Sequence, residues 1–316
     1  CMDIINKRRK DFSEFFSVHV DAAYGGYFPT IFQPGVKYDF PQKEITQQYE
    51  KLHINSQALQ EVDSITVDPH KMGFTPYGAG IFITQHNYLK SWVEETAAYV
   101  FTPFDSSGNE IECSLSLGKF TLEGSRPGAA AASTYFTHSL IPLHYDGHGK
   151  LLQELCDVAR NFYEHINIFN QKLAKNESGL KIIAINRPDT NIVCFFVTHE
   201  NISKISELNE LNRSLSGHFG MKNVESIHSY SYLISHTSIS TETLFSQENS
   251  AINKLEKDKN EIIALRHVFM NRWIKGQTAT GKSYIEDYFD TLIERANHFT
   301  ILKRVIPIVK LSENAN

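Results

Sequence analysis

The sequence predicts an α/β fold, and three observations support this prediction. Short apolar runs of the kind that form buried strands occur at residues 17–20, 64–67 and 80–84. Segments of helical composition alternate with these runs, an order that is typical of a mainly parallel sheet. The chain has 316 residues, of which 41% are hydrophobic and 21% are charged, so it can bury a sizeable core.

The first half of the chain supplies the segments between the predicted strands. The polar segment 41–60 is predicted to form a helix or a surface excursion, and segment 87–100 has helical composition. A loop rich in Asp, Ser and Gly follows at 104–109. Segment 127–140 begins with a proline and contains four consecutive alanines, which predicts a closely packed helix.

The second half predicts a smaller α+β domain. Residues 149–173 place large apolar side chains on one broad face and predict a long amphipathic helix. The segments that follow alternate in an order that fits an antiparallel sheet with helices. The predicted strands are 181–186, 191–198, 227–235 and 262–270, and the predicted helices are 201–215 and 283–297. We therefore expect a large domain at 1–148, a connecting helix at 149–175 and a small domain at 176–316.

Composition excludes several classes of partner. A net charge of −5 argues against binding to nucleic acid, and the short basic run at residues 7–10 is interpreted as a solvated helix face. No run approaches the roughly 20 apolar residues that a membrane-spanning helix needs. The four cysteines are few and scattered, which is typical of reduced thiols in a cytoplasmic protein.

The run at residues 63–73 carries the first candidate site. A strand-like segment ends at Pro69 and is followed by His70 and Lys71 in a turn that contains Gly73. A lysine at the end of a buried strand can be desolvated, which lowers its pKa and makes the amine a nucleophile able to form a Schiff base. The alternative is an ordinary surface lysine in a turn.

A second strand-like run ends in a similar context, at Asp21, Ala22 and Ala23. The alternative for Asp21 is a turn or capping residue. A strand-end aspartate together with a strand-end lysine is what pyridoxal phosphate (PLP) requires, because the lysine holds the aldehyde and the carboxylate keeps the pyridine nitrogen protonated.

These two motifs resemble those of the group II PLP-dependent decarboxylases, which have the aspartate-aminotransferase-like type I fold. Within that family the chain resembles the bacterial tyrosine decarboxylases and the related aspartate or glutamate decarboxylases. The similarity continues through residues 76–80, 122–132, 235–237 and 265–266 and spans nearly the whole chain. It implies a truncated large domain followed by a small C-terminal α+β domain.

The resemblance implies a role for each residue around the cofactor. Lys71 would form the aldimine with PLP, and Asp21 would pair with the pyridinium nitrogen. Ala23 matches the small residue that lies against the ring, and His70 would lie near the phosphate.

Further candidates concern the substrate and proton transfer. Tyr99 matches the tyrosine of a mobile loop that protonates the intermediate, and Tyr77 is a rival proton donor. Arg266 would bind the substrate carboxylate, for which a guanidinium is suited by its two parallel donors. Arg126 lies in a turn that the resemblance places near the active site. For each tyrosine, an ordinary core or surface position is the alternative.

Members of the family carry a long segment before the Asp-Ala-Ala strand, whereas this chain reaches Asp21 almost at once. The resemblance therefore implies the C-terminal part of a longer enzyme that lacks an N-terminal segment, and it implies a homodimer. The predicted activity is decarboxylation of an amino acid, with an aromatic substrate such as tyrosine favoured over glutamate or aspartate.

Alternatives to this activity remain. The same Lys and Asp would serve a PLP-dependent carbon–carbon lyase of the aldolase type or an aminotransferase. The chain could also be an inactive fragment or a non-catalytic dimerising partner. A metal site at His144, Asp146 and His148 is rejected, because residues of these types before a helix are more often turn and capping residues.

Overall fold

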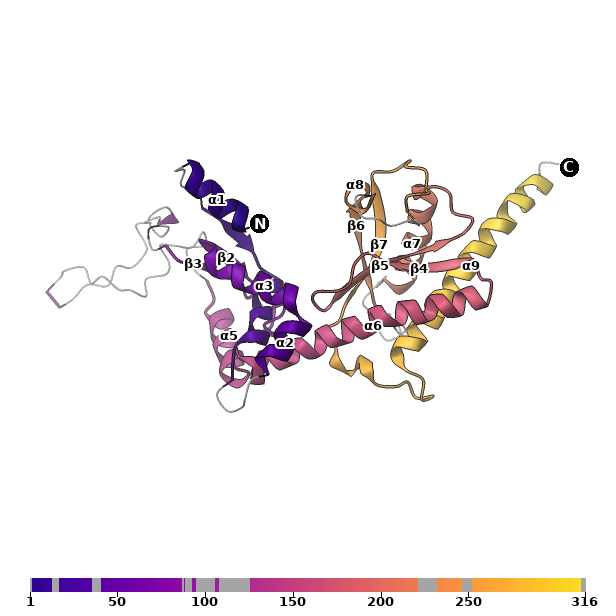
Figure 1. Cartoon of the computed structure of the whole chain (residues 1–316). Coiled ribbons are helices and arrows are strands. Elements are labelled where there is room, and N and C mark those ends of the chain that lie inside the picture. The colour runs from indigo at the N-terminus through magenta and orange to yellow at the C-terminus, as the bar shows by residue number, and fades with distance from the viewer. Residues whose placement is uncertain are drawn as a thin grey trace. The chain divides into compact units, whose positions relative to one another are not determined.

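The computed structural model describes residues 2–12, 17–35, 41–86, 88, 93–94, 106–107, 126–220, 232–245 and 252–313 (Figure 1). The chain divides into two compact units, Cys1–Leu152 and Gln153–Asn316. The assignment of these units to the large and small domains expected at 1–148 and 176–316 stays a prediction. None of the described helices is long and apolar enough to cross a membrane.

The first unit contains a three-stranded sheet in the order β1-β2-β3. Strand β1 (His19–Asp21) pairs in parallel with β2 (Ser64–Val67), and Asp21 lies opposite Thr66. Parallel neighbours need a long crossover between them. That crossover consists of η1 (Gly25–Phe32), α2 (Gln42–Gln48), α3 (Glu50–Ala58) and η2 (Leu59–Glu61).

The expectation of a mainly parallel sheet is wrong for β3 (Ile81–Thr84), which pairs antiparallel with β2. Between the two strands the chain makes turns and no helix, so it returns along β2 in the opposite direction. The predicted strand at 80–84 is nevertheless found within one residue of its expected start.

The 3-10 helix η1 packs closely beside β2 and beside the turn η4 (Tyr145–Gly149), which follows α5 (Ala129–Leu140). A Cβ atom on Gly26 would lie 2.7 Å from Cγ2 of Val67, and one on Gly149 would collide with the carbonyl oxygen of Thr30. Only glycine allows these approaches. The start of β2 is held by Asp63, which accepts hydrogen bonds from Val18 N and His86 Nε2.

Burial alone would raise the pKa of Asp63. The hydrogen bonds from Val18 N, His86 and Arg9, together with the positive charge of Arg9, outweigh burial and lower this pKa to about 2. Helix α1 (Met2–Phe12) supplies Arg9, so Asp63 fastens α1 to the strand that carries the candidate site.

The second unit is built on a four-stranded antiparallel sheet in the order β4-β5-β7-β6 (Figure 1). This agrees with the antiparallel sheet expected for the second half. Its strands are β4 (Leu180–Ala184), β5 (Ile192–His199), β6 (Ser235–Ser240) and β7 (Glu261–Val268). Its helices are α6 (Lys150–Lys175), α7 (Ile205–Phe219), α8 (Thr241–Phe245), η6 (Arg272–Lys275) and α9 (Tyr284–Glu313).

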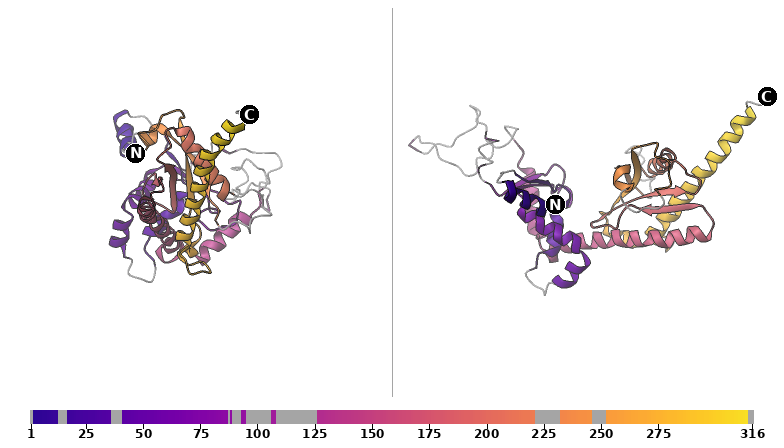
Figure 2. Two further views of the ribbon diagram at one scale, coloured as in Figure 1. Left: turned by 90° about the vertical axis from the view of Figure 1, so that its right-hand side faces the viewer. Right: turned by 45° about the horizontal axis from the view of Figure 1, so that its top comes forward.

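Side chains of β5 alternate between two apolar clusters. Val193, Phe195 and Val197 point into a core that also contains α6 and α9, both of which lie along this sheet in Figure 2. Phe196 points to the other face and packs with Ile183, among others. This alternation is the period of two that a strand imposes on its side chains.

Two asparagines of α7 complete the sheet where β5 and β7 no longer pair. Asn212 donates to Val197 O and accepts from Val197 N. Asn209 donates to Glu261 O and accepts from Ile263 N at 2.8 Å. Because the backbone groups of a buried strand must be paired, these amides replace the missing ladder bonds and fix α7 to the sheet.

Candidate functional site

The two sequence motifs meet at one edge of the first unit's sheet. Asp68, which follows β2, donates from its backbone N to Ala23 O at 3.0 Å. Because β1 and β2 are parallel, both motifs leave the sheet at the carboxyl ends of their strands. This edge is where open α/β sheets bind their ligands.

Lys71 lies in the turn after β2, with its Nζ 2.8 Å from Oδ2 of Asp68. The backbone N of Lys71 donates to Asp68 O at 3.0 Å, which closes the turn. About a third of the Lys71 side chain (34%) is exposed, against 17% for Asp68. The desolvation expected for Lys71 is therefore only partial in the described residues, and its ammonium faces a carboxylate rather than apolar side chains.

Asp21 ends β1 with its side chain exposed. Its Oδ1 accepts a hydrogen bond from Ala23 N at 3.0 Å, a short-range bond typical of an aspartate at the start of a turn. The bond orients the carboxylate at the same sheet edge as Lys71. It is also the structural role that the sequence left open as the alternative.

His70 is held by contacts on three sides. Its Nδ1 lies within hydrogen-bond distance of Ala79 O, and its Nε2 lies 3.6 Å from Oδ2 of Asp68. The ring of Tyr77 lies over it with 4.4 Å between ring centroids. Asp68 thus contacts both members of the His-Lys pair, although the sequence did not single it out. Its position three residues before the lysine was the available signal.

Tyr77 covers His70 from the solvent side. Its side chain is 85% exposed, and Gly78, which follows it, has a φ of +80°. A positive φ favours glycine, so this turn needs Gly78 to bring Tyr77 over the histidine.

The backbone that follows Lys71 is tightly packed. A Cβ atom on Gly73 would lie 2.6 Å from the Tyr27 ring, and Phe74 has a φ of +57°. Thr75 donates its backbone N to Pro69 O, while its buried Oγ1 has no hydrogen-bond partner among the described residues. An orphaned hydroxyl of this kind is a group that a polar ligand could satisfy.

These observations fit a cofactor that carries an aldehyde and a ring nitrogen. An accessible primary amine and an accessible carboxylate follow or end adjacent parallel strands, and the small residue Ala23 donates its backbone N to that carboxylate. The donor set of Lys71, Asp21 and His70 therefore fits PLP.

A buried histidine lies directly behind the Lys71 turn. His148 is fully buried, and its Nε2 lies 3.1 Å from Gly73 O while its Nδ1 lies 2.9 Å from Ile141 O. Its ring stacks between the rings of Tyr27 and Phe74. Sequence reasoning treated His148 as a turn or capping residue, because nothing in the linear pattern places it beside a turn 75 residues away.

A second histidine completes this cluster. The Tyr27 hydroxyl lies 3.0 Å from His138 Nε2. Burial raises the pKa of Tyr27 to about 12. Burial, and then the nearby His148, lower the pKa of His138. Both shifts favour a tyrosine hydroxyl that donates to a neutral His138.

Other predicted site residues lie elsewhere. Arg266 is in the second unit, on β7, where its Nε donates to Ser235 Oγ at 3.0 Å. Arg126 is exposed and precedes α5. Tyr99 and most of segment 87–100 lie outside the described residues.

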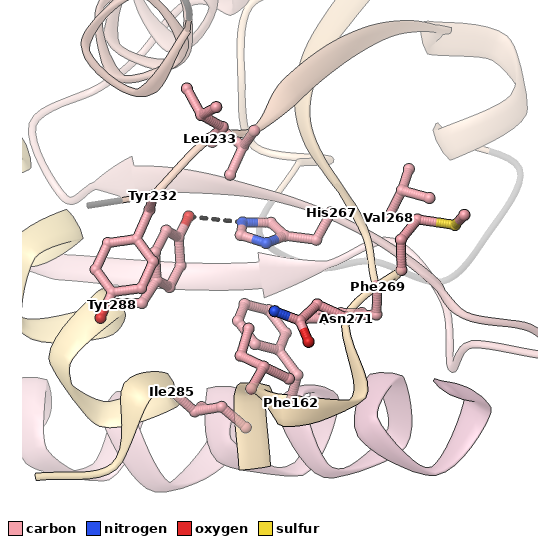
Figure 3. Close-up of a pocket in the computed structure, with 12 residues that line it drawn as sticks. Phe162, Tyr232, Leu233, His267, Val268, Phe269, Asn271, Ile285 and Tyr288 are labelled. Carbon is pink, nitrogen blue, oxygen red and sulfur yellow. Dashed lines mark hydrogen bonds between the residues drawn. The ribbon is translucent and has the colours of Figure 1, made fainter. Parts of the chain in front are cut away.

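The second unit contains a cavity of about 250 Å³ whose lining includes residues 267–270, which follow the predicted Arg266 along and beyond β7 (Figure 3). The imidazole of His267 and the hydroxyl of Tyr288 face each other there, 2.8 Å apart. Burial lowers the pKa of His267 to about 3 and raises that of Tyr288, so both groups are neutral near pH 7. Arg266 precedes His267 on β7 and points to the opposite face of the strand.

No protein-family model matches the chain. Among curated proteins it is 27% identical over 272 residues to an L-tyrosine decarboxylase of Enterococcus faecium, which covers 81% of this chain and 43% of that relative. It is 31% identical over 215 residues to the L-tyrosine decarboxylase of Enterococcus faecalis, covering 64% of this chain and 33% of the relative. A probable L-aspartate decarboxylase of Pyrococcus abyssi is 31% identical over 53% of this chain and 36% of the relative. The chain thus spans less than half the length of these relatives.

Solved structures share the fold at low sequence identity. A structure of Oryza sativa TDC with PLP and tryptamine superimposes with a TM-score of 0.55 and 14% identity, over 93% of this chain and 47% of that one. Mouse CSAD in apo form gives a TM-score of 0.54 and 14% identity, over 93% of this chain and 48% of that one. The predicted aspartate-aminotransferase-like fold is thereby confirmed. The chain is thus similar in sequence to L-tyrosine and L-aspartate decarboxylases and similar in fold to these two solved structures.

Proposed function

We propose that this protein is a PLP-dependent carboxy-lyase that removes the α-carboxylate of an L-amino acid as carbon dioxide. The observation that carries this proposal is the hydrogen bond from Asp68 N to Ala23 O, because it joins the Asp-Ala-Ala motif to the His-Lys turn at one sheet edge. The similarity to tyrosine and aspartate decarboxylases supports the reaction class.

In this proposal PLP, when bound, supplies an electron sink for the pair of electrons that the departing carboxylate leaves behind. Lys71 Nζ is the point of attachment, and Asp68 Oδ2 orients that amine from 2.8 Å. The Asp21 carboxylate, which Ala23 N already orients, would accept a hydrogen bond from the protonated ring nitrogen. His70, which contacts Ala79 O and Asp68, would bind the cofactor phosphate.

The remaining roles concern the substrate. A tyrosine, Tyr99 or Tyr77, returns a proton to the substrate carbon in place of the lost carboxylate. Of the two, Tyr77 already covers His70 beside the Lys71 turn. Arg266 takes the substrate carboxylate through its guanidinium. We further propose a cytoplasmic homodimer, the assembly that the family resemblance implies.

Replacement of Lys71 by alanine tests the attachment site. We expect PLP followed by borohydride to add the cofactor mass to the tryptic peptide that contains Lys71, and Lys71→Ala to abolish both this label and carbon dioxide release. Lys282→Ala is the matched control, because Lys282 is also an ion-paired lysine, bound to Asp287 and Asp290. A label that persists at full stoichiometry in Lys71→Ala would overturn the assignment.

A further inference from the structure

The Lys71 turn has one fully buried polar side chain behind it, that of His148. Both ring nitrogens of His148 face backbone carbonyl oxygens, Gly73 O at 3.1 Å and Ile141 O at 2.9 Å. A carbonyl oxygen only accepts, so each contact is a hydrogen bond when the nitrogen that faces it carries a hydrogen. The imidazole therefore contacts both the turn after β2 and the segment that follows α5, and the Nε2–H form donates to Gly73 O.

The ring is held in place by its faces as well as by its edges. Tyr27 and Phe74 stack on it with centroid separations of 5.5 Å and 5.4 Å, and both are nearly parallel to it. His138 meets it edge-on at 5.5 Å. Because Phe74 is itself part of the turn, His148 contacts this turn through a backbone carbonyl and through a side chain.

The turn needs such support, because its backbone is strained. Phe74 has a φ of +57°, a conformation that a bulky residue rarely adopts without compensation. Gly73 lies so close to the Tyr27 ring and to Pro69 O that any Cβ would collide with them. The Gly73 carbonyl that His148 contacts stands two residues after Lys71.

We propose that His148 is a positioning residue for Lys71, which it fixes from behind by binding the Gly73 carbonyl and stacking on Phe74. The two contacts of His148, with the Gly73 carbonyl and with the Phe74 ring, are called the clamp below. Its role in catalysis rests on the proposed function, whereas the contacts themselves belong to the turn. With His148 in place, Lys71 Nζ is kept against the Asp68 carboxylate. Without it, the turn opens and the amine leaves its partner.

Two substitutions separate the parts of this clamp. His148→Phe keeps a flat ring between Tyr27 and Phe74 and removes both nitrogens. His148→Gln removes the ring and keeps an amide donor that can reach one of the two carbonyls. His138→Phe is the matched control, since His138 belongs to the same aromatic cluster and bonds Tyr27 rather than the turn.

Two measurements on the purified protein report the clamp without any cofactor. Competitive labelling with isotope-coded acetic anhydride gives the reactivity of each lysine at peptide resolution across a pH series, with Lys282 as internal reference. Amide hydrogen exchange reports the protection of Lys71 N, Phe74 N and Thr75 N, which donate to Asp68 O, Lys71 O and Pro69 O.

In His148→Phe we expect Lys71 to be acetylated about tenfold faster and these amides to exchange about tenfold faster, the scale of one lost buried hydrogen bond. His148→Gln should recover part of both effects, and His138→Phe should leave them near wild-type values. Circular dichroism checks that each variant is folded.

The inference would be overturned if Lys71 acetylation and amide exchange in His148→Phe kept their wild-type rates. It would also be overturned if both rates rose equally in His148→Phe and His148→Gln. If His148→Phe does not fold, the comparison of His148→Gln with His138→Phe decides in the same way. These outcomes are independent of the proposed function, because acetylation of Lys71 needs no PLP. Absence of the PLP label on Lys71 would contradict the proposed function and would not affect the inference about His148.

Discussion

At the scale of a single residue, the proposed chemistry depends most on the negative charge of Asp21. Its carboxylate keeps its place through one bond from Ala23 N. Asp21→Asn retains the shape and loses the charge that stabilises a protonated ring nitrogen. We expect the cofactor label on Lys71 to persist and turnover to fall about 100-fold, the usual effect of losing one electrostatic group at a reacting centre.

Asp258→Asn is the matched control for this prediction. Asp258 also accepts a backbone hydrogen bond through Oδ1, from Ser206 N at 2.9 Å, but it lies in the second unit. Rapid-quench measurement of carbon dioxide release should give wild-type turnover for Asp258→Asn. Turnover of Asp21→Asn within about threefold of wild type would contradict the role of Asp21, because it would leave almost none of the expected loss.

Sequence patterns predict site residues that lie within two short motifs, and they miss residues that folding brings beside those motifs. The strand-like runs predict Asp21 and Lys71, whereas the family resemblance adds Ala23 and His70. His148 could not be placed, since its contacts with Gly73 and Phe74 depend on how η4 packs against η1 and the turn after β2. The partial exposure of Lys71 was also missed, because exposure depends on neighbours that the local sequence does not specify.

At the scale of an element, β7 carries a histidine that makes the second unit sensitive to acid. His267 has a folded-state pKa of about 3, lowered from 6.5 by burial. Between these values the unfolded chain binds a proton that the folded chain does not, so the free energy of unfolding falls as pH falls from about 6.5 toward 3. Above pH 6.5 this contribution to stability is fully present.

We expect the free energy of unfolding of wild type to fall by about 2 kcal/mol more than that of His267→Leu between pH 7.5 and pH 5. The difference accrues over about 1.5 pH units, between pH 6.5 and pH 5, at roughly 1.4 kcal/mol for each unit. Thermal unfolding followed by circular dichroism at both pH values measures this difference. His218→Leu, which removes an exposed histidine of α7, should show the wild-type dependence. An identical pH dependence in wild type and His267→Leu would contradict the assignment.

Elements with a clear hydrophobic period were predicted well, and elements without one were displaced. The apolar stripe at 149–173 forms α6, because its face packs on the sheet. Strand β6 begins at Ser235, the last residue of the predicted strand 227–235, of which residues 227–231 lie outside the described residues. Among the described strands it pairs with β7 alone, and its side chains are half-buried or exposed in alternation. An edge strand of this kind has no buried apolar face to mark it in the sequence.

At the scale of the whole molecule, the order of strands and helices in the sequence predicted the α/β fold class. The direction of each strand depended instead on the length of the segment that connects it to its neighbour. β3 turned antiparallel because no helix separates it from β2. The fold class therefore followed from patterns that extend over many residues. Contacts between distant segments, such as Asp68 N with Ala23 O, decided which predicted residues meet.

The distribution of charge around Lys71 bears on the choice of substrate. We predict an aromatic L-amino acid such as tyrosine. An acidic side chain would need a cation beside the reacting centre, whereas the charged residues next to Lys71 in the described structure are Asp68 and, across the sheet edge, Asp21. We expect carbon dioxide release from tyrosine to exceed release from glutamate and aspartate by at least about tenfold, the scale on which an unpaired charge is rejected. Parallel assays with carboxyl-labelled substrates measure this ratio, and Lys71→Ala protein gives the background for each. A preference for either acidic substrate would contradict the prediction and leave the decarboxylase proposal standing.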